Sequence, residues 1–168
     1  MKKIITLSVL LLTSLVVNSQ IIYSKAFGNP KDKAIIFLHG GPGFNSVSFE
    51  VTTAQKLSQN GFYVITYDRR GEGRSINQNA DYTFSEAFND LNSIFEKYEL
   101  KSATLIGHSF GGTIATLFAE KYPEKTNAII LTGAPISIQE TLSTIIESSK
   151  LIYQSKKDSL NLSYIELL

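Results

Sequence analysis

Residues 103–112 read Ala-Thr-Leu-Ile-Gly-His-Ser-Phe-Gly-Gly, and this stretch decides the fold. Its first four residues form an apolar run of the kind found in strands that are buried on both faces of a parallel sheet. The residues after it predict a helix from Gly111 to Tyr122, which Pro123 ends. Ser109 would therefore lie on a tight turn between a strand and a helix, with its hydroxyl presented above the sheet edge.

The turn Gly107-His108-Ser109-Phe110-Gly111 matches the pattern G-x-S-x-G. This pattern is weak alone, but a strand before it and a helix after it are the setting in which it positions a nucleophilic serine. The two glycines are expected because the neighbouring backbone leaves no room for a Cβ atom. The amides at the start of the helix favour developing negative charge. Ser109 is therefore the candidate nucleophile.

Further apolar runs and helical patterns alternate along the chain. Strands are expected at 21–27, 34–38, 62–67 and 128–131, and helices at 47–59 and 84–98. Thr83 and Glu86 form a capping box at the start of the last of these helices. The apolar runs predict strands that are buried on both faces, and the alternation predicts a parallel sheet with helices on both sides.

A glycine-rich loop, His39-Gly40-Gly41-Pro42-Gly43, follows the strand that ends at Leu38. Such a loop can bring a backbone N–H toward the serine, as a second oxyanion donor beside the amide of Phe110. A tight turn at a strand end would by itself explain the glycines equally well. The presence of the serine turn favours the functional interpretation.

Together with residues 67–75, Tyr-Asp-Arg-Arg-Gly-Glu-Gly-Arg-Ser, these motifs resemble the α/β-hydrolase superfamily, and most closely its branch of proline iminopeptidases. The resemblance implies an α/β fold with a mostly parallel sheet, helices on both faces, and a core that is incomplete at the C-terminus. It also implies that Ser109 attacks an acyl carbon, with the amides of Gly41 and Phe110 as oxyanion donors. Asp68 and Arg74 are expected to belong to a structural loop, with charge pairs that fix the turn beneath the site, rather than to act in catalysis.

The chain divides into three predicted parts. Residues 1–19 are expected to be a signal peptide, 20–136 the N-terminal part of the hydrolase core, and 137–168 the start of a truncated helical lid. The leader has Lys2 and Lys3, then an apolar run of residues 4–17, and a cleavage point after Ser19. That run is shorter than the ~20 residues of a membrane-spanning helix. We expect an exported protein, periplasmic or secreted, without a stable span after cleavage; an uncleaved anchor or a buried first strand are the alternatives.

Composition narrows the classes of partner. Lys and Arg number 16 against 15 Asp and Glu, which argues against a nucleic-acid-binding protein. The chain has no cysteine and two histidines, which argues against disulfides, thiolate catalysis and a metal site. We expect no cofactor, and a small-molecule ester, amide or short peptide as the substrate.

The sequence after Ser109 does not supply the two partners that complete a catalytic triad. In the superfamily an acid and a histidine follow the serine along the chain, yet no histidine follows Ser109. His108 is a poor base because adjacent side chains point apart, and His39 is expected to hold the shape of its loop. We therefore expect either a serine hydrolase, aminopeptidase-like by analogy, of which this is a fragment, or an inactive remnant or binding module.

A dinucleotide-binding site is a further alternative. Gly41, Gly43 and Ser46 have the spacing of the fingerprint glycines, and Asp68 ends the next expected strand. However, Ser46 replaces the third glycine, Pro42 removes an amide, and the serine turn stays unexplained. A phosphate-binding P-loop is excluded because no lysine follows Gly112.

Overall fold

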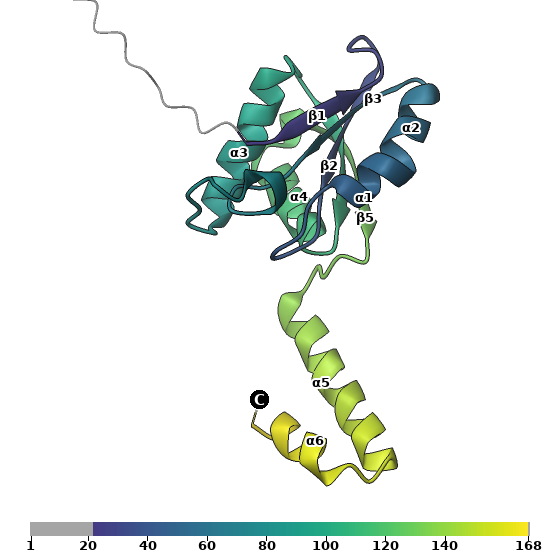
Figure 1. Ribbon diagram of the computed structural model, residues 1–168, viewed down its shortest axis with the longest axis vertical. Coiled ribbons are helices and arrows are strands. Elements are labelled where there is room, and N and C mark those ends of the chain that lie inside the picture. The colour runs from purple at the N-terminus through teal and green to yellow at the C-terminus, as the bar shows by residue number, and fades with distance from the viewer. Residues whose placement is uncertain (1–21, 168) are drawn as a thin grey trace, which may run out of the picture.

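The apolar runs form one sheet in the computed structural model, which describes residues 22–167 (Figure 1). The strands are β1 (Ser24–Phe27), β2 (Lys33–Leu38), β3 (Phe62–Tyr67), β4 (Ala103–His108) and β5 (Thr126–Thr132). Their order is β1-β3-β2-β4-β5, with β1 antiparallel to β3 and the other neighbours parallel. The expected mostly parallel sheet is confirmed, whereas the predicted signal peptide lies outside the described residues.

The helices follow the expected segments with two differences. They are α1 (Val47–Phe49), α2 (Gln55–Gln59), α3 (Phe84–Lys97), α4 (Phe110–Lys121), α5 (Ile138–Ser155) and α6 (Ser159–Ile165). The helix expected at 47–59 is interrupted by a π-helical turn, Glu50–Ala54, between α1 and α2. Helix α4 begins at Phe110, one residue earlier than predicted, because Ser109 already has the N-cap position.

Helices cover both faces of the sheet (Figure 1). Helices α3 and α4 pack on one face, where Leu91, Phe95 and Phe118 are buried against the strands. The rings of Phe95 and Phe118 stack there with their centroids 5.8 Å apart. The segment from α1 to α2 covers part of the other face, and Ala54 and Phe37 belong to its smaller core. This two-sided packing fixes the strand ends from which the site is built.

Strand β5 is a correction to the sequence-based prediction. Its apolar residues were expected to be buried on both faces, but Ile130 is 47% exposed, and Ile129 and Leu131 are exposed as well. The reason is its position at the edge of the sheet, where within residues 22–167 it pairs only with β4. An apolar strand tends to be buried, but the exposed fraction of its side chains depends on which other elements pack against it.

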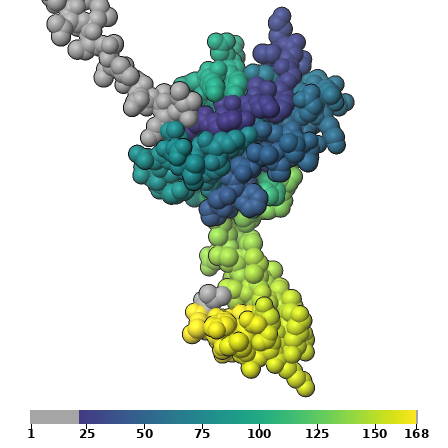
Figure 2. All heavy atoms as spheres, viewed as in Figure 1, coloured from purple at the N-terminus to yellow at the C-terminus, as the bar shows by residue number. Residues whose placement is uncertain are grey.

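Helices α5 and α6 form a hairpin that extends away from the sheet (Figures 1 and 2). Ser137 caps α5 by accepting a hydrogen bond from the Glu140 amide at 3.3 Å. Leu142, Ile145 and Ile152 of α5 are all exposed. Among the helices of residues 22–167, none combines the length and the apolar composition that crossing a membrane requires.

The glycines around Ser109 are held in very close packing. A Cβ atom on Gly111 would lie 2.2 Å from the carbonyl oxygen of Leu38 and 2.5 Å from that of His39. A Cβ atom on Gly107 would lie 2.4 Å from the Cα atom of Gly112. The sequence-based explanation of these two glycines is therefore confirmed, since backbone atoms occupy the space of a side chain.

Gly111→Ala tests this packing, because a tight contact and an ordinary helix position predict changes of opposite sign in the free energy of unfolding. In an ordinary helix the change would stabilise the protein by about 1 kcal/mol. Here the clash with backbone oxygens should lower the free energy of unfolding by about 3 kcal/mol. Urea denaturation measures the difference. Asn89→Ala, an exposed change on α3, is the control and should stay within about 0.5 kcal/mol of the unaltered protein. An alanine at 111 that stabilises the protein would show that the contact is not tight.

Candidate active site

Ser109 occupies the turn between β4 and α4 in a strained conformation. Its φ is 49° and its ψ is −125°, which few residues other than glycine adopt. The turn is held by two hydrogen bonds, from the Ser109 amide to the carbonyl of Thr132 at 3.0 Å and from the Gly112 amide to the carbonyl of Ser109 at 2.8 Å. Such strain persists only where the surrounding structure imposes it, and it is concentrated at functional sites.

The glycine-rich loop lies directly against this serine. A Cβ atom on Gly40 would lie 3.2 Å from the Cβ atom of Ser109. Gly41, the next residue, is half-buried, and Phe110 begins α4. The first amides of a helix have no partner within the helix, so that of Phe110 is available to a bound group. The structure thus places Gly40 of the loop against Ser109, whereas the roles of Gly41 and Phe110 as oxyanion donors stay predictions.

Arg69 and Glu72 clamp the loop from the other side. The Arg69 guanidinium donates hydrogen bonds to the carbonyl oxygens of His39 and Gly40, the latter at 2.8 Å. Glu72 accepts a hydrogen bond from the Gly43 amide at 3.0 Å and pairs with Arg69 at 2.7 Å. Arg69 thus binds two carbonyls of the loop, and Glu72 binds the amide of Gly43.

His39 is a buried, neutral part of this clamp. Its Nε2 atom accepts a hydrogen bond from the Arg69 amide at 3.0 Å, so Nδ1 carries the proton and donates it to the carbonyl of Gly40 at 2.6 Å. Burial, and then the charge of Arg69, lower the pKa of His39 to about 4 despite the opposing charge of Glu72. The prediction that His39 holds the shape of the loop is confirmed, and both of its nitrogens are engaged.

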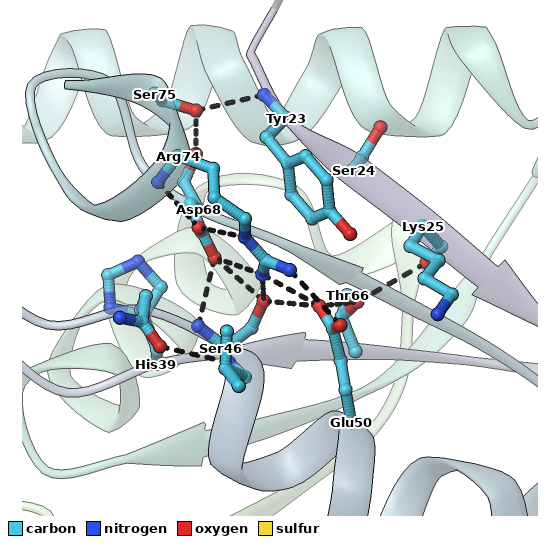
Figure 3. Close-up of polar contacts among 12 residues, drawn as sticks. Tyr23, Ser24, Lys25, His39, Ser46, Glu50, Thr66, Asp68, Arg74 and Ser75 are labelled. Carbon is cyan, nitrogen blue, oxygen red and sulfur yellow. Dashed lines mark hydrogen bonds and ion pairs between the residues drawn. The ribbon is translucent and has the colours of Figure 1, made fainter.

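A buried charge cluster lies beneath the loop and anchors it to the sheet (Figure 3). Arg74 pairs with Asp68 and with Glu50, each at 2.7 Å. The Ser46 hydroxyl donates to Asp68 at 2.7 Å, and the Thr66 hydroxyl donates to Glu50 at 3.0 Å. Burial alone would raise the pKa of Asp68, but hydrogen bonds from Arg74 and Ser46 lower it well below its usual value. The expected charge pair of Asp68 and Arg74 is thus confirmed.

The same cluster holds the first described strand in place. The guanidinium of Arg74 lies over the ring of Tyr23, 3.5 Å from its centroid. Ser75 accepts a hydrogen bond from the Tyr23 amide and donates one to the carbonyl of Asp68, both at 2.8 Å. Because Asp68 is fully buried and both of its carboxylate oxygens are engaged, it does not offer the exposed acid that a dinucleotide ribose needs.

His108 is next to the serine, and its ring also lies against the glycine-rich loop, since a Cβ atom on Gly40 would lie 2.9 Å from its Nδ1 atom. It is exposed, and it lines a hollow together with Phe49 and Ile130 rather than the side of Phe110. This agrees with the expectation that adjacent side chains point apart. In the part of the chain that the structure describes, no three His, Cys, Asp or Glu side chains are grouped so that they could hold a metal ion.

A cavity of about 280 Å³ opens on the side of Phe110 and Pro42. Arg70 lines it and pairs with Asp90 and with Glu86 of α3. No sequence motif marks Glu50, and none gives Arg69 a role in holding the loop. The sequence signal for Glu50 is its spacing of four residues from Ser46, whose hydroxyl oxygen lies 3.0 Å from the Glu50 carboxylate.

Comparison with known proteins identifies the family to which the chain belongs. Residues 33–154 match the family described as alpha/beta hydrolase fold. The protein named "Probable proline iminopeptidase" of Leptolyngbya boryana is 27% identical over 67% of this chain and 35% of its own length. Rhodomycin D methylesterase of a Streptomyces species is 30% identical over 67% of this chain and 39% of its own length.

The fold is also similar to that of solved hydrolase structures. A carboxylesterase from Nitrososphaera gargenis has a TM-score of 0.66 and 27% identity, and the similarity covers 81% of this chain and 51% of the esterase. This chain spans about a third of the length of the curated relatives that it matches.

The neutral state of His39 predicts how stability depends on pH. The pKa of the residue is about 4 in the folded chain and about 6.5 in the unfolded chain, so the unfolded chain binds more protons between these values. Stability should therefore rise with pH in this window, and about 3 kcal/mol should be lost as the pH falls from 6.5 to 4. Urea denaturation at four pH values measures the slope.

The variant His39→Gln separates this effect from that of the carboxylates. Glutamine does not titrate, so the slope between pH 6.5 and 4.5 should flatten, although the variant is less stable at pH 7. The stabilisation from Asp68 is lost at lower pH, because its folded pKa lies below its usual value. An equal slope in both proteins would show that His39 is not the titrating group.

Proposed function

Because this chain belongs to the α/β-hydrolase fold family, we propose that it is a serine hydrolase that cleaves ester or amide bonds with Ser109 as the nucleophile. One observation carries the proposal: the backbone of Gly40 lies against the Cβ atom of a serine held in a strained turn at a helix N-terminus. A serine in a purely structural turn would need neither this strain nor this neighbour.

The reaction follows from the groups around the serine. The Ser109 oxygen attacks the carbonyl carbon, and the carbonyl oxygen takes the negative charge of the tetrahedral intermediate. The amides of Gly41 and Phe110 donate hydrogen bonds to this oxygen. Collapse breaks the bond to the alcohol or amine and leaves an acyl-enzyme, which water cleaves to regenerate the serine. Removing one such amide donor costs about 10²–10³ in rate.

The clamp of Arg69 and Glu72 supports the role of the loop. Oxyanion donors act because they are fixed before the charge develops. Arg69 holds the carbonyls of His39 and Gly40, and Glu72 holds the amide of Gly43, so both flanks of Gly41 are fixed. A loop held in this way needs no rearrangement when the substrate reacts.

The proton of Ser109 needs a base that the two histidines of the chain do not supply. His39 is buried with both nitrogens engaged, and His108 lines the hollow of Phe49 and Ile130. Loss of the base lowers kcat by about 10⁶ and leaves about 10³–10⁴ over the uncatalysed rate. This observation favours a second candidate function for the chain by itself, a scaffold that binds its ligand without turnover.

The relatives indicate the range of substrates. Their names are those of a proline iminopeptidase, a methylesterase and a carboxylesterase, which act on peptide or ester bonds. We extend this range to the chain as a whole: small esters, amides or short peptides. We also propose that residues 137–168 are the start of a lid, although their α5–α6 hairpin extends away from the sheet in this structure.

Chemical rescue tests the role of Ser109. A fluorophosphonate should label Ser109 in preference to every other serine, as peptide mass spectrometry would show, because among the serines of residues 22–167 Ser109 alone has a strained, positive φ, and it lies at a helix N-terminus. Imidazole in the buffer should accelerate this labelling, since it replaces the missing base. Ser109→Ala is the control and should remove the labelled peptide. If Ser109 stays unlabelled in the folded protein with and without imidazole, the binding scaffold becomes the better account.

We also propose that the protein is exported, on the basis of Lys2, Lys3 and the apolar run of residues 4–17. Cell fractionation should find the protein outside the cytoplasm, and its N-terminal sequence should begin at Gln20. Replacing both lysines by glutamate should retain the uncleaved chain in the cell. An intact N-terminus on cytoplasmic protein would contradict the proposal.

A further inference from the structure

We propose that the cavity beside Phe110 binds the acyl part of the substrate, and that this part is a short, uncharged apolar group of the size of phenylacetyl. The inference rests on the proposed function, because it assigns the cavity to the same reaction. It adds the class of substrate, which the family and the motifs leave open.

The position of the cavity links it to the reacting serine. Its walls include Pro42 and Phe110, which directly follow Gly41 and Ser109 in the chain. The opposite wall is the start of α3, with Phe84 and Ala87. Ser109 and Gly41 do not line the cavity themselves, but each is followed in the chain by a residue of its wall, so an acyl group bound at Ser109 could extend into it.

The chemistry of the walls favours an uncharged ligand. Every charged side chain in the walls already has a partner: Arg70 pairs with Asp90 and Glu86, and Arg69 pairs with Glu72. A charged ligand would have to compete with these pairs or lose its hydration without a partner, which costs several kcal/mol.

Carbon atoms make up most of the remaining lining. Phe84 and Phe110 place their rings 5.9 Å apart at the cavity, and Ile114 and Ala87 complete this side. Glu86 fixes the rim, since its carboxylate accepts hydrogen bonds from the amides of Asp81 and Tyr82, at 2.9 and 3.0 Å. The apolar walls are thus held in a defined shape before any ligand enters.

The volume limits the size of the group. A cavity of about 150 Å³ accepts benzene. The cavity here, of about 280 Å³, has room for one ring and a short linker. Long fatty acyl chains would extend beyond it, and an acetyl group would leave most of it empty.

A titration without chemistry tests the binding site. Phenylacetamide added to the Ser109→Ala protein should shift the amide NMR signals of Phe84, Ala87 and Phe110, with a Kd of about 1 mM for a ligand of this size. Phenylacetate and phenethylamine have a similar skeleton with a negative and a positive charge, and should bind roughly tenfold more weakly. Equal binding of all three, or shifts confined to β5 or α5, would overturn the inference.

Two variants on one helix provide the matched comparison. Ala87→Met extends a side chain into the cavity and should weaken phenylacetamide binding roughly tenfold. Asn89→Met adds the same side chain at an exposed position of α3 outside the cavity and should leave the Kd unchanged. If Ala87→Met fails to fold, the pattern of shifts in the Ser109→Ala protein still decides the question.

Competition separates this inference from the proposed function. In the unaltered protein, saturating phenylacetamide should slow fluorophosphonate labelling of Ser109 at least about tenfold, if the cavity receives the acyl group. Labelling at an undiminished rate would overturn the inference and leave Ser109 as the nucleophile. Binding at the cavity without any labelling of Ser109 would instead remove the proposed function, and with it the acyl assignment.

Discussion

The contact between Gly111 and the carbonyl oxygens of Leu38 and His39 is the constraint on which the site depends. It presses the start of α4 against the end of β2, so the serine turn and the glycine-rich loop have to meet. A side chain at Gly111 would separate them. The strained φ of Ser109 is a consequence, because the chain must leave β4 and enter α4 within one residue.

Charged residues of the loop after β3 stabilise the serine turn and the glycine-rich loop, which this contact brings together. Arg69 binds the carbonyls of the glycine-rich loop from one side of Asp68, and Arg74 joins Asp68 to Glu50 on the other. Removing one partner from a buried pair costs about 3–5 kcal/mol, because the other charge is left without compensation. This short loop therefore controls the position of groups that belong to other elements.

Local patterns predicted most of the fold and the position of Ser109 on the turn between a strand and a helix. Thr83 and Glu86 marked the start of α3 correctly, and the G-x-S-x-G turn located Ser109 between its strand and its helix. The clamp formed by Arg69 was not predictable, because it joins residues 29 and 30 positions apart, which only the folded sheet brings together. The exposure of β5 was mispredicted since burial depends on neighbours that a strand's own residues do not reveal.

Strand β5 has a consequence for how the protein behaves in solution. From Thr126 to Thr132 it has no charged residue and no proline, which are two of the features that natural edge strands use to prevent pairing with other molecules. Short apolar segments of this kind are nuclei of intermolecular β-structure. Within residues 22–167 this edge is available for intermolecular pairing, and a charge at Asn127 or Ile130 would be the place to block it.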